Sequence, residues 1–270
     1  MIEIQDLKNL CINASRNLVE MLNERDGFKG TLLHPNLETK MIFPIYELEI
    51  TGDKGDVRIS EQEARFQFCL AIERYYKEIF YSVETPTKYN YSFSGKDDEN
   101  KNIKKLQIFK PEPKNPDVGM SARFDMSLFE RNLDNKFEQV CDIEFKLQSP
   151  DKEQIEKDLL KLFAEAKAGV FFHFVYNNRK HAFQNDLIKF QKSADDIFNK
   201  FNLINIKGSQ DIKDDFNKQK TILFAFFLLD LGELHFKEFW HNKTTRKSND
   251  FFSYEDPQIN EKNGWESVKL

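Results

Sequence analysis

The stretch Cys141-Asp142-Ile143-Glu144-Phe145-Lys146-Leu147 alternates apolar with charged side chains. A period of two is typical of a β-strand that packs one face on a core. The other face sets Asp142, Glu144 and Lys146 about 6 to 7 Å apart, because a strand rises roughly 3.3 Å per residue. Carboxylates this close need positive charge between them. Two interpretations stay open here, a cross-strand ladder of salt bridges or a site for a divalent cation, which prefers carboxylate oxygens.

A second strand with the same pattern precedes this stretch. Residues 122–129 place apolar side chains on one face and Arg123, Asp125 and Ser127 on the other. The turn-forming residues 132–135 predict a hairpin between the two strands. Asp125 and Glu144 are then expected side by side, where like charges destabilise a sheet unless something compensates them. A metal site is the economical explanation for this pair.

A helix predicted over residues 61–81 carries a third carboxylate. Ser60 and Glu63 have the spacing of a capping box at its start. Glu61 falls at the centre of the apolar face, so we expect it to point toward the following strands. The alternative is that Glu61 turns to water and only favours the helix dipole. Glu63 is kept as the substitute acid, because helix starts are often misplaced by a residue or two.

The remaining periodicities predict an α/β fold in which helices flank a central mixed β-sheet, with an N-terminal helical extension. We divide the chain into an extension (1–57), a core (58–235) and a C-terminal tail (236–270) whose last ten residues are irregular. The other expected elements are helices at 2–24, 151–167 and 183–200, a strand at 81–85 that Pro86 ends, and buried strands at 170–176 and 222–229.

The composition describes a folded globular protein, with 40% hydrophobic and 31% charged residues and 27 Phe to fill a core. The net charge of −5 argues against a generally basic nucleic-acid coat, although a local basic groove is compatible with it. Residues 89–117 interleave lysines, including Lys104 and Lys105, with aromatics such as Tyr89 and Tyr91. This segment is either a nucleic-acid surface or an ordinary solvated loop.

The cysteines and the apolar runs bear on compartment. Cys11, Cys69 and Cys141 form no CxxC pair, so we do not expect a structural zinc site, and a sparse, odd set fits a reducing cytoplasm. The N-terminus lacks the pattern of a signal peptide. The longest apolar run, 222–229, is too short to span a membrane. We therefore predict a cytoplasmic protein without a membrane segment.

The order of these elements resembles the PD-(D/E)XK nuclease superfamily, which has the restriction-endonuclease-like fold. The matching residues are Asp125 in ARFD, Glu144-x-Lys146 in DIEFK and an acid in SEQE at 60–63. The hairpin and the helix after Lys146 agree as well, and the match covers roughly residues 58–176. One departure is Phe124, which stands where the family motif has proline.

The resemblance implies a magnesium- or manganese-dependent hydrolase of phosphodiester bonds, with DNA favoured over RNA as substrate. Asp125, Glu144 and Glu61 would hold the metal ion, and Lys146 would orient or deprotonate the attacking water. Gln148 could hold substrate or water, and Arg123 could contact phosphate or instead pair with Asp125 or Asp142. Lys104 and Lys105, from the segment of interleaved lysines, are the other candidates for substrate binding.

Alternatives to this function stay open in the sequence. The chain could be an RNase, a nuclease subunit that awaits a partner, or a silent nucleic-acid-binding or scaffold protein of the same fold. A homodimer or a specificity-giving partner protein fits the absence of an evident DNA-reading module. Endonucleases and exonucleases both occur in the superfamily, in restriction, phage defence and repair.

Overall fold

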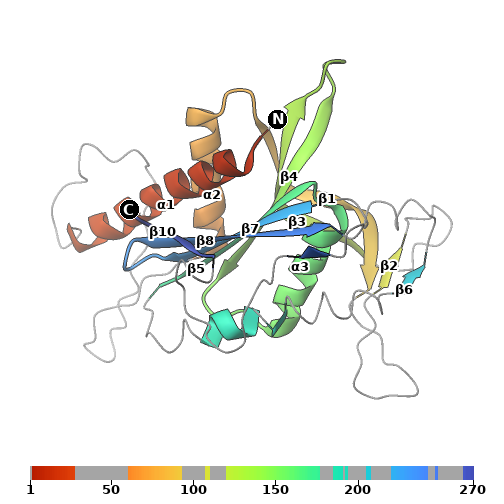
Figure 1. Cartoon of the computed structure of the whole chain (residues 1–270). Helices are drawn as coiled ribbons and strands as arrows, with labels where there is room; N and C mark the ends of the chain where they lie inside the picture. Colours follow the sequence, from red (N-terminus) through yellow and green to blue (C-terminus); the bar gives the residue numbers. More distant parts are fainter. Residues whose placement is uncertain are drawn as a thin grey trace.

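The computed structural model describes residues 2–27, 60–92, 107–109, 120–176, 185–190, 192–193, 205–207, 220–242, 247–248 and 264–270. A sheet lies between helices on its two faces (Figure 1). The elements are α1 (Ile4–Gly27), α2 (Glu61–Tyr75), β1 (Phe80–Ser92), β2 (Gln107–Phe109), β3 (Met120–Arg131), β4 (Phe137–Leu147), α3 (Lys152–Glu165), β5 (Ala168–Val175), β6 (Asn205–Lys207), β7 (Lys220–Leu228), β8 (Glu233–Asn242), β9 (Lys247–Ser248) and β10 (Glu266–Lys269).

Ten strands of the described ranges form one mixed sheet in the order β10-β8-β7-β5-β4-β3-β1-β2-β6, with β9 beside β8. The central strands β4, β5 and β7 run parallel, and β3 and β8 flank them antiparallel. Helix α3 makes the crossover that a parallel β4–β5 pair requires. The expected α/β class, the mixed sheet and the two buried strands, now β5 and β7, are confirmed.

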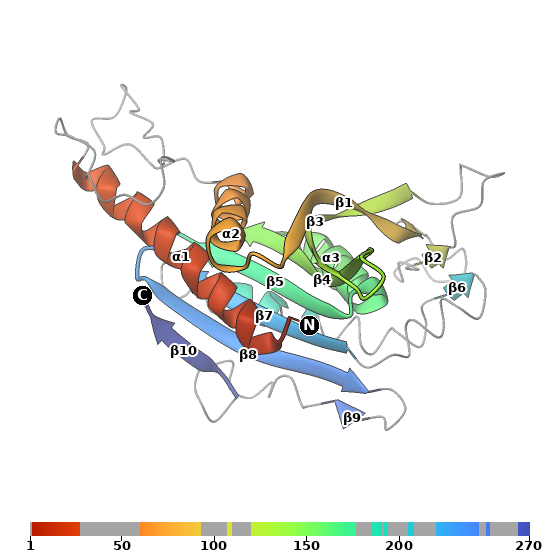
Figure 2. The ribbon, with the colours of Figure 1, turned by 90° about the horizontal axis from the view of Figure 1, so that it is seen from above.

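Helices α1 and α2 cover one face of the sheet, and α3 covers the other (Figures 1 and 2). The apolar stripe of α1 is buried as predicted, and Phe68 of α2 packs edge-on against Phe145, with ring centroids 4.9 Å apart. The core on this face includes Leu7, Leu10, Ala14, Leu18, Phe68, Ile72, Ile143, Phe145, Val170 and Phe172. The core on the α3 face includes Tyr89, Tyr91, Phe124, Leu159, Phe163, Phe171, Phe190, Phe224 and Trp265.

The charged face of β4 is not solvated, which corrects the half-buried strand expected from the alternation. Asp142 and Glu144 are each 1% exposed. Because β4 lies inside the sheet and α3 crosses its polar face, both faces are covered. Alternation reports which side chains share a face, but not what packs on that face.

Strand β1 does not end at Pro86 but continues to Ser92, with Pro86 in register with Arg123. Tyr89 and Tyr91 are each 2% exposed, so they belong to the core rather than to a surface for nucleic acid. Lys104 and Lys105 lie outside the described residues.

Two further boundaries differ from the predictions. Helix α2 ends at Tyr75, and β1 begins at Phe80 within the range expected to be helical. The expected irregular C-terminal end contains β10, which pairs with β8, and Trp265 beside it is buried. Within the expected helix at 183–200, residues 185–190 and 192–193 are helical.

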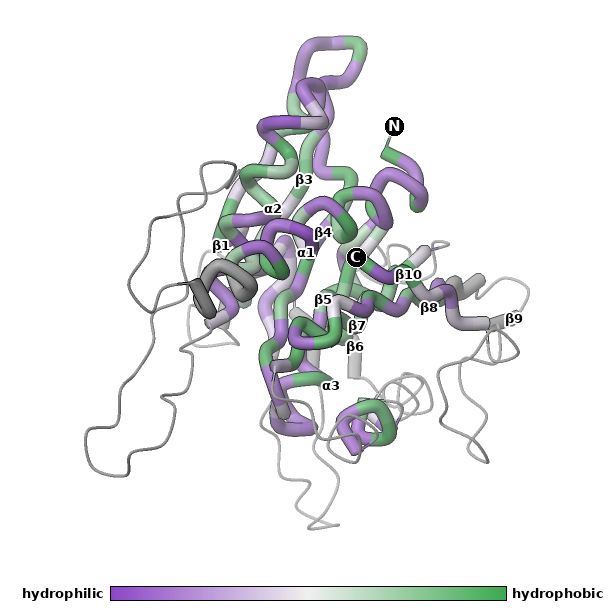
Figure 3. Tube along the Cα trace, turned by 90° about the vertical axis from the view of Figure 1, so that its left-hand side faces the viewer, coloured by the Kyte–Doolittle hydropathy of each residue, from purple (hydrophilic) through white to green (hydrophobic). Residues whose placement is uncertain are grey.

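The predicted hairpin joins β3 to β4 and projects from the body of the molecule (Figures 1 and 3). Its turn is stabilised by the Asn132 side chain, whose Oδ1 accepts hydrogen bonds from the backbone of Asp134 and Lys136. Asn135 takes a positive φ of 60°, which asparagine tolerates better than most residues.

No helix in the described ranges is long and apolar enough to cross a membrane.

Candidate active site at the end of β4

The ladder between β3 and β4 ends at the pair Met126–Ile143, and Asp125 is the first β3 residue beyond it. Its Oδ2 accepts a hydrogen bond of 2.8 Å from the backbone N–H of Phe145. Glu61 of α2 does the same two residues further on, because its Oε1 accepts a hydrogen bond of 3.2 Å from Leu147 N–H. Residues two apart direct their N–H groups to the same side of a strand. The carboxylates of Asp125 and Glu61 therefore take the place of β3 along this edge of β4. The two N–H groups that they bind belong to the residues directly before and after Lys146.

Asp125 is held in place by a cation that the sequence reading overlooked. The Arg65 guanidinium donates to Asp125 Oδ1 at 2.9 Å and to Glu84 Oε1 at 2.7 Å. Glu84 stands opposite Asp125 between two paired positions of β1 and β3, and it has a positive φ of 53°. Such a backbone is uncommon for a residue with a Cβ and often marks a functional or constrained position.

Glu144 is almost completely enclosed. Its side chain is 2% exposed, and its Oε1 lies 2.5 Å from the Lys161 ammonium, whose own side chain is 4% exposed. The contact is a close ion pair between two buried side chains. Burial raises the pKa of Glu144 well above its usual range, with Asp158 adding to the rise and Lys161 opposing it. Glu144 is thus a buried carboxylate whose compensating positive charge comes from Lys161 of α3.

Lys146 contacts a carboxylate of α3 rather than one of its own strand. Its ammonium lies 2.7 Å from Asp158 Oδ2 and donates to the Phe145 carbonyl at 3.0 Å. The other oxygen of Asp158 lies 2.9 Å from the Lys161 ammonium. Burial opposes the charge of Lys146, but Asp158, Glu61 and Glu144 outweigh it and raise the pKa of Lys146. Lys146 therefore carries its proton in this arrangement.

The two acids of the α2 start have separate roles. Glu63 Oε2 accepts a hydrogen bond of 2.8 Å from the Ser60 backbone N–H and also contacts the Ser60 hydroxyl, so the expected capping box is confirmed. Glu61 takes no part in the capping box, and its carboxylate binds the Leu147 N–H of β4. Burial raises the pKa of Glu61, Lys146 lowers it and Asp125 raises it, which places the three groups within one electrostatic cluster.

The other sequence-derived site residues lie differently. Asp142 accepts from Ser127 Oγ at 2.6 Å and from Gln139, so neutral donors satisfy it away from Lys146. Arg123 is exposed, and its carbonyl rather than its guanidinium joins the network, by accepting from Lys161 at 2.8 Å. Gln148 donates to the Tyr176 carbonyl at 3.1 Å, which ties its amide to the backbone after β5.

Glu61 of α2 and Asp125 of β3 thus bind the backbone of the strand that carries Glu144 and Lys146. Their roles in binding a metal ion and in catalysis stay predictions. Carboxylate oxygens are the ligands that Mg²⁺ prefers. In its present form, however, the described part of the chain contains no group of three or more His, Cys, Asp or Glu side chains arranged to hold a metal ion. Lys161 and Arg65 supply positive charge at Glu144 and Asp125 instead.

Three residues of this cluster were missed at the level of sequence, namely Arg65, Asp158 and Lys161. Each had a signal. Arg65 follows Glu61 by four residues, which places both on one side of a helix. Asp158 follows the buried Ile155 by three residues, beside the apolar stripe of α3, and a carboxylate there needs a partner.

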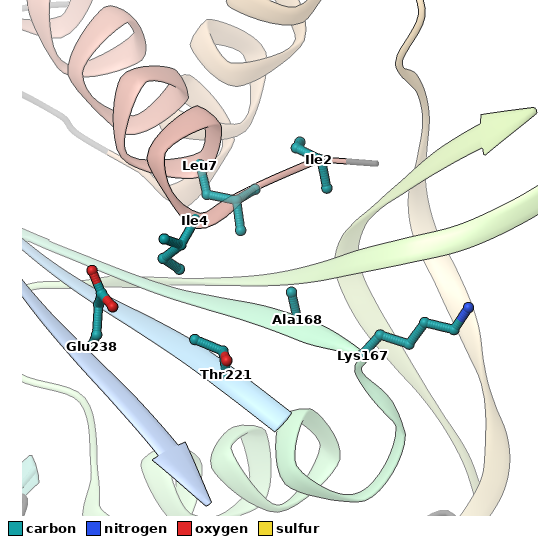
Figure 4. Close-up of a pocket in the computed structure, with 7 residues that line it drawn as sticks. All are labelled: Ile2, Ile4, Leu7, Lys167, Ala168, Thr221 and Glu238. Carbon is teal, nitrogen blue, oxygen red and sulfur yellow. The ribbon is translucent and has the colours of Figure 1, made fainter. Parts of the chain in front are cut away.

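A separate pocket of about 500 Å³ opens between the start of α1 and the strands β5, β7 and β8 (Figure 4). It is lined by Ile2, Ile4, Leu7, Lys167, Ala168, Thr221 and Glu238. Its walls belong to the α1 face of the sheet, whereas Glu144 and Lys146 face α3. The pocket and the acidic cluster are therefore distinct features.

Comparison with known proteins does not identify a relative, so the functional conclusion rests on the geometry of the site. No family model, curated protein or solved structure matches the chain.

Proposed function

We propose that this protein is a metal-dependent nuclease that hydrolyses phosphodiester bonds, with DNA favoured over RNA as its substrate. The observation that carries the proposal is the convergence at one end of β4. Glu61 and Asp125 accept hydrogen bonds from Leu147 and Phe145, while Glu144 and Lys146 project from the same strand toward α3.

The order of elements supports the resemblance to the PD-(D/E)XK superfamily. The chain runs α2, β1, β3, β4, α3 and β5, with an antiparallel β3–β4 hairpin and a parallel β4–β5 pair. This is the helix, strand, hairpin, helix and strand order on which the resemblance rests. A salt-bridged sheet without chemistry would not require an acid at the start of α2 to reach β4.

Asp125, Glu144 and Glu61 would hold Mg²⁺ or Mn²⁺ in this proposal. Bound Mg²⁺ neutralises charge on a scissile phosphate and lowers the pKa of a bound water. Lys146, whose ammonium lies 2.7 Å from Asp158, would orient or deprotonate the water and stabilise the developing negative charge. Arg65 holds Asp125 in position.

A second candidate is a catalytically silent nucleic-acid-binding or scaffold protein of the same fold. The ion pairs Glu144–Lys161 and Asp158–Lys146 favour it, because they compensate the buried acids without a metal ion. The two candidates differ in whether a divalent cation ever enters the cluster.

Cleavage assays on duplex DNA, single-stranded DNA and RNA, each with Mg²⁺ or a chelator, test the proposal. We expect Mg²⁺-dependent cleavage that Asp125→Asn and Lys146→Ala each reduce at least about 100-fold. Cleavage of RNA alone would make the protein an RNase. Absence of cleavage of all three substrates, together with unchanged binding of DNA by both variants, would favour the silent protein.

A further inference from the structure

We propose that Lys161 is a built-in counter-cation of Glu144, which occupies this carboxylate in the metal-free protein and must leave it when a divalent cation binds. The inference rests on the proposed function. It assigns a regulatory role to a residue of α3 that the nuclease motif does not include.

The position of Lys161 is the first observation. Its ammonium lies 2.5 Å from Glu144 Oε1, in an ion pair between two buried side chains. The same ammonium donates to the Arg123 carbonyl at 2.8 Å and lies 2.9 Å from Asp158 Oδ1. Lys161 therefore has two well-placed acceptors apart from Glu144.

The Asp158 carboxylate and the Arg123 carbonyl can still bind the Lys161 ammonium after it leaves Glu144. A buried lysine that lost its only partner would carry a large desolvation penalty. Asp158 and the Arg123 carbonyl already contact Lys161, so the exchange needs only a small displacement of a flexible side chain. Asp158 is 5% exposed and also binds Lys146, which keeps its carboxylate fixed.

The Lys161–Glu144 ion pair compensates the charge of a buried carboxylate when no metal ion is bound. Without a cation, the buried Glu144 carboxylate would destabilise the fold, and Lys161 supplies the missing charge. A divalent cation brings the same compensation from outside. The two cations compete for one oxygen, so the metal affinity of the wild-type protein is lower than that of a site without Lys161.

Calorimetric titration with Mn²⁺ tests the competition. We expect Lys161→Met to bind Mn²⁺ at least about tenfold more tightly than the wild type. Lys146→Met is the control for a through-space effect, because it also removes a buried ammonium but one that contacts Asp158 instead of Glu144. Its gain should be clearly smaller. Lys157→Met, at an exposed position of the same helix, should change the affinity less than about twofold.

The outcomes separate the inference from the proposed function. If the wild type binds Mn²⁺ and Lys161→Met binds it equally or more weakly, or no better than Lys146→Met, the counter-cation role is wrong while the metal site stands. If neither the wild type nor any variant binds Mn²⁺, the proposed function fails and the inference with it.

A second measurement covers the case in which Lys161 variants do not fold. A crystal structure of the wild type with Mn²⁺ should show the Lys161 ammonium on Asp158 and the Arg123 carbonyl, more than about 4 Å from Glu144. Mn²⁺ bound to Glu144 with the ammonium still in ion-pair contact would overturn the inference.

Discussion

At the scale of single residues, the cluster beneath α3 is a chain of alternating charges, Glu144, Lys161, Asp158 and Lys146. Buried pairs of this kind contribute little net stability, but the loss of one member leaves the other charge uncompensated. Their presence in the interior thus says more about chemistry than about stability. Two of the four, Glu144 and Lys146, are residues to which the proposed function assigns a role.

Coupling between Glu144 and Lys161 is the first prediction at this scale. Lys161→Met should lower the free energy of unfolding by about 3 to 5 kcal/mol, because it strands a buried carboxylate. Adding Glu144→Gln should restore at least about 1 kcal/mol of that loss. Urea unfolding of the two single variants and the double variant measures the coupling. Strictly additive losses would show that the two side chains do not interact.

His173 of β5 yields a prediction of pH dependence. Its Nε2 lies 2.5 Å from the Gln148 carbonyl, Nδ1 has no hydrogen-bond partner among the described residues, and burial lowers the pKa of His173 from 6.5 to about 4. Between these pH values the unfolded chain binds the proton and the folded protein does not. Stability is therefore lost as the pH falls from about 6.5 to about 4, by roughly 3 kcal/mol in total.

The variant His173→Gln keeps a donor for the Gln148 carbonyl but cannot titrate. Urea unfolding at pH 7 and at pH 4.5 should show a smaller loss of stability on acidification for this variant than for the wild type. Equal losses in the two proteins would mean that His173 does not titrate as its burial requires.

At the scale of elements, β1 keeps its course past Pro86 because α3 holds it. The Glu165 carboxylate, at the end of α3, accepts hydrogen bonds from Lys88 N–H, Tyr89 N–H and the Tyr91 hydroxyl. The three donors satisfy a group that burial would otherwise disfavour. This tie positions the second half of β1 against the α3 core.

Glu165→Ala should therefore destabilise the protein by about 2 to 3 kcal/mol, since it removes three hydrogen bonds to a partly buried charged group. Amide hydrogen exchange should accelerate at Lys88 and Tyr89 more than at the start of β1. Glu153→Ala, at an exposed position of the same helix, should stay within about 0.5 kcal/mol of the wild type. Unchanged exchange at Lys88 would contradict the role of Glu165.

The elements also show where reading the sequence succeeds. Apolar residues at a spacing of 3.6 predict α1, α2 and α3, and alternating apolar residues predict β3 and β4. These patterns can be read from the sequence because each arises where one face of an element packs against an adjacent layer of the fold. The capping box at Ser60 is local and was predicted for the same reason. Glu61 and Asp125 were expected to converge on β4, and they do.

The failures concern packing between elements distant in sequence. Pro86 is accepted in β1 because other contacts hold the strand, and the polar face of β4 is buried because α3 crosses it. Asp158 and Lys161 join the site through that crossing, which no local pattern specifies. Arg65 joins the site through Glu84 of β1 and Asp125 of β3, contacts between distant elements that no local pattern specifies.

At the scale of the whole molecule, the sheet extends well beyond the strands that carry the cluster. Strands β7, β8 and β10 widen the sheet on one side of β5. Helix α1 packs on these strands as well as on the central ones. Trp265 packs against Phe226 with ring centroids 5.7 Å apart, and it is 4% exposed. The residues around β10 are thus part of the folded core.

Trp265→Ala should cost about 3 to 5 kcal/mol of unfolding free energy, as expected for a large buried aromatic side chain. Leu231→Ala, which truncates a residue that is 47% exposed, serves as the control and should cost far less. Chemical denaturation of both variants gives the comparison. A Trp265→Ala protein as stable as the wild type would show that this end of the chain does not contribute to the core.

We propose that the charged end of β4 hydrolyses phosphodiester bonds with a divalent metal ion. The most direct measurement is the single-turnover rate of cleavage of labelled duplex DNA, followed against Mg²⁺ concentration for the wild type, Lys146→Met and Lys157→Met. We predict a rate that rises with Mg²⁺ in the wild type and in Lys157→Met, and that falls at least about 100-fold in Lys146→Met. Cleavage that is independent of Mg²⁺, or equal in Lys146→Met and the wild type, would contradict the account.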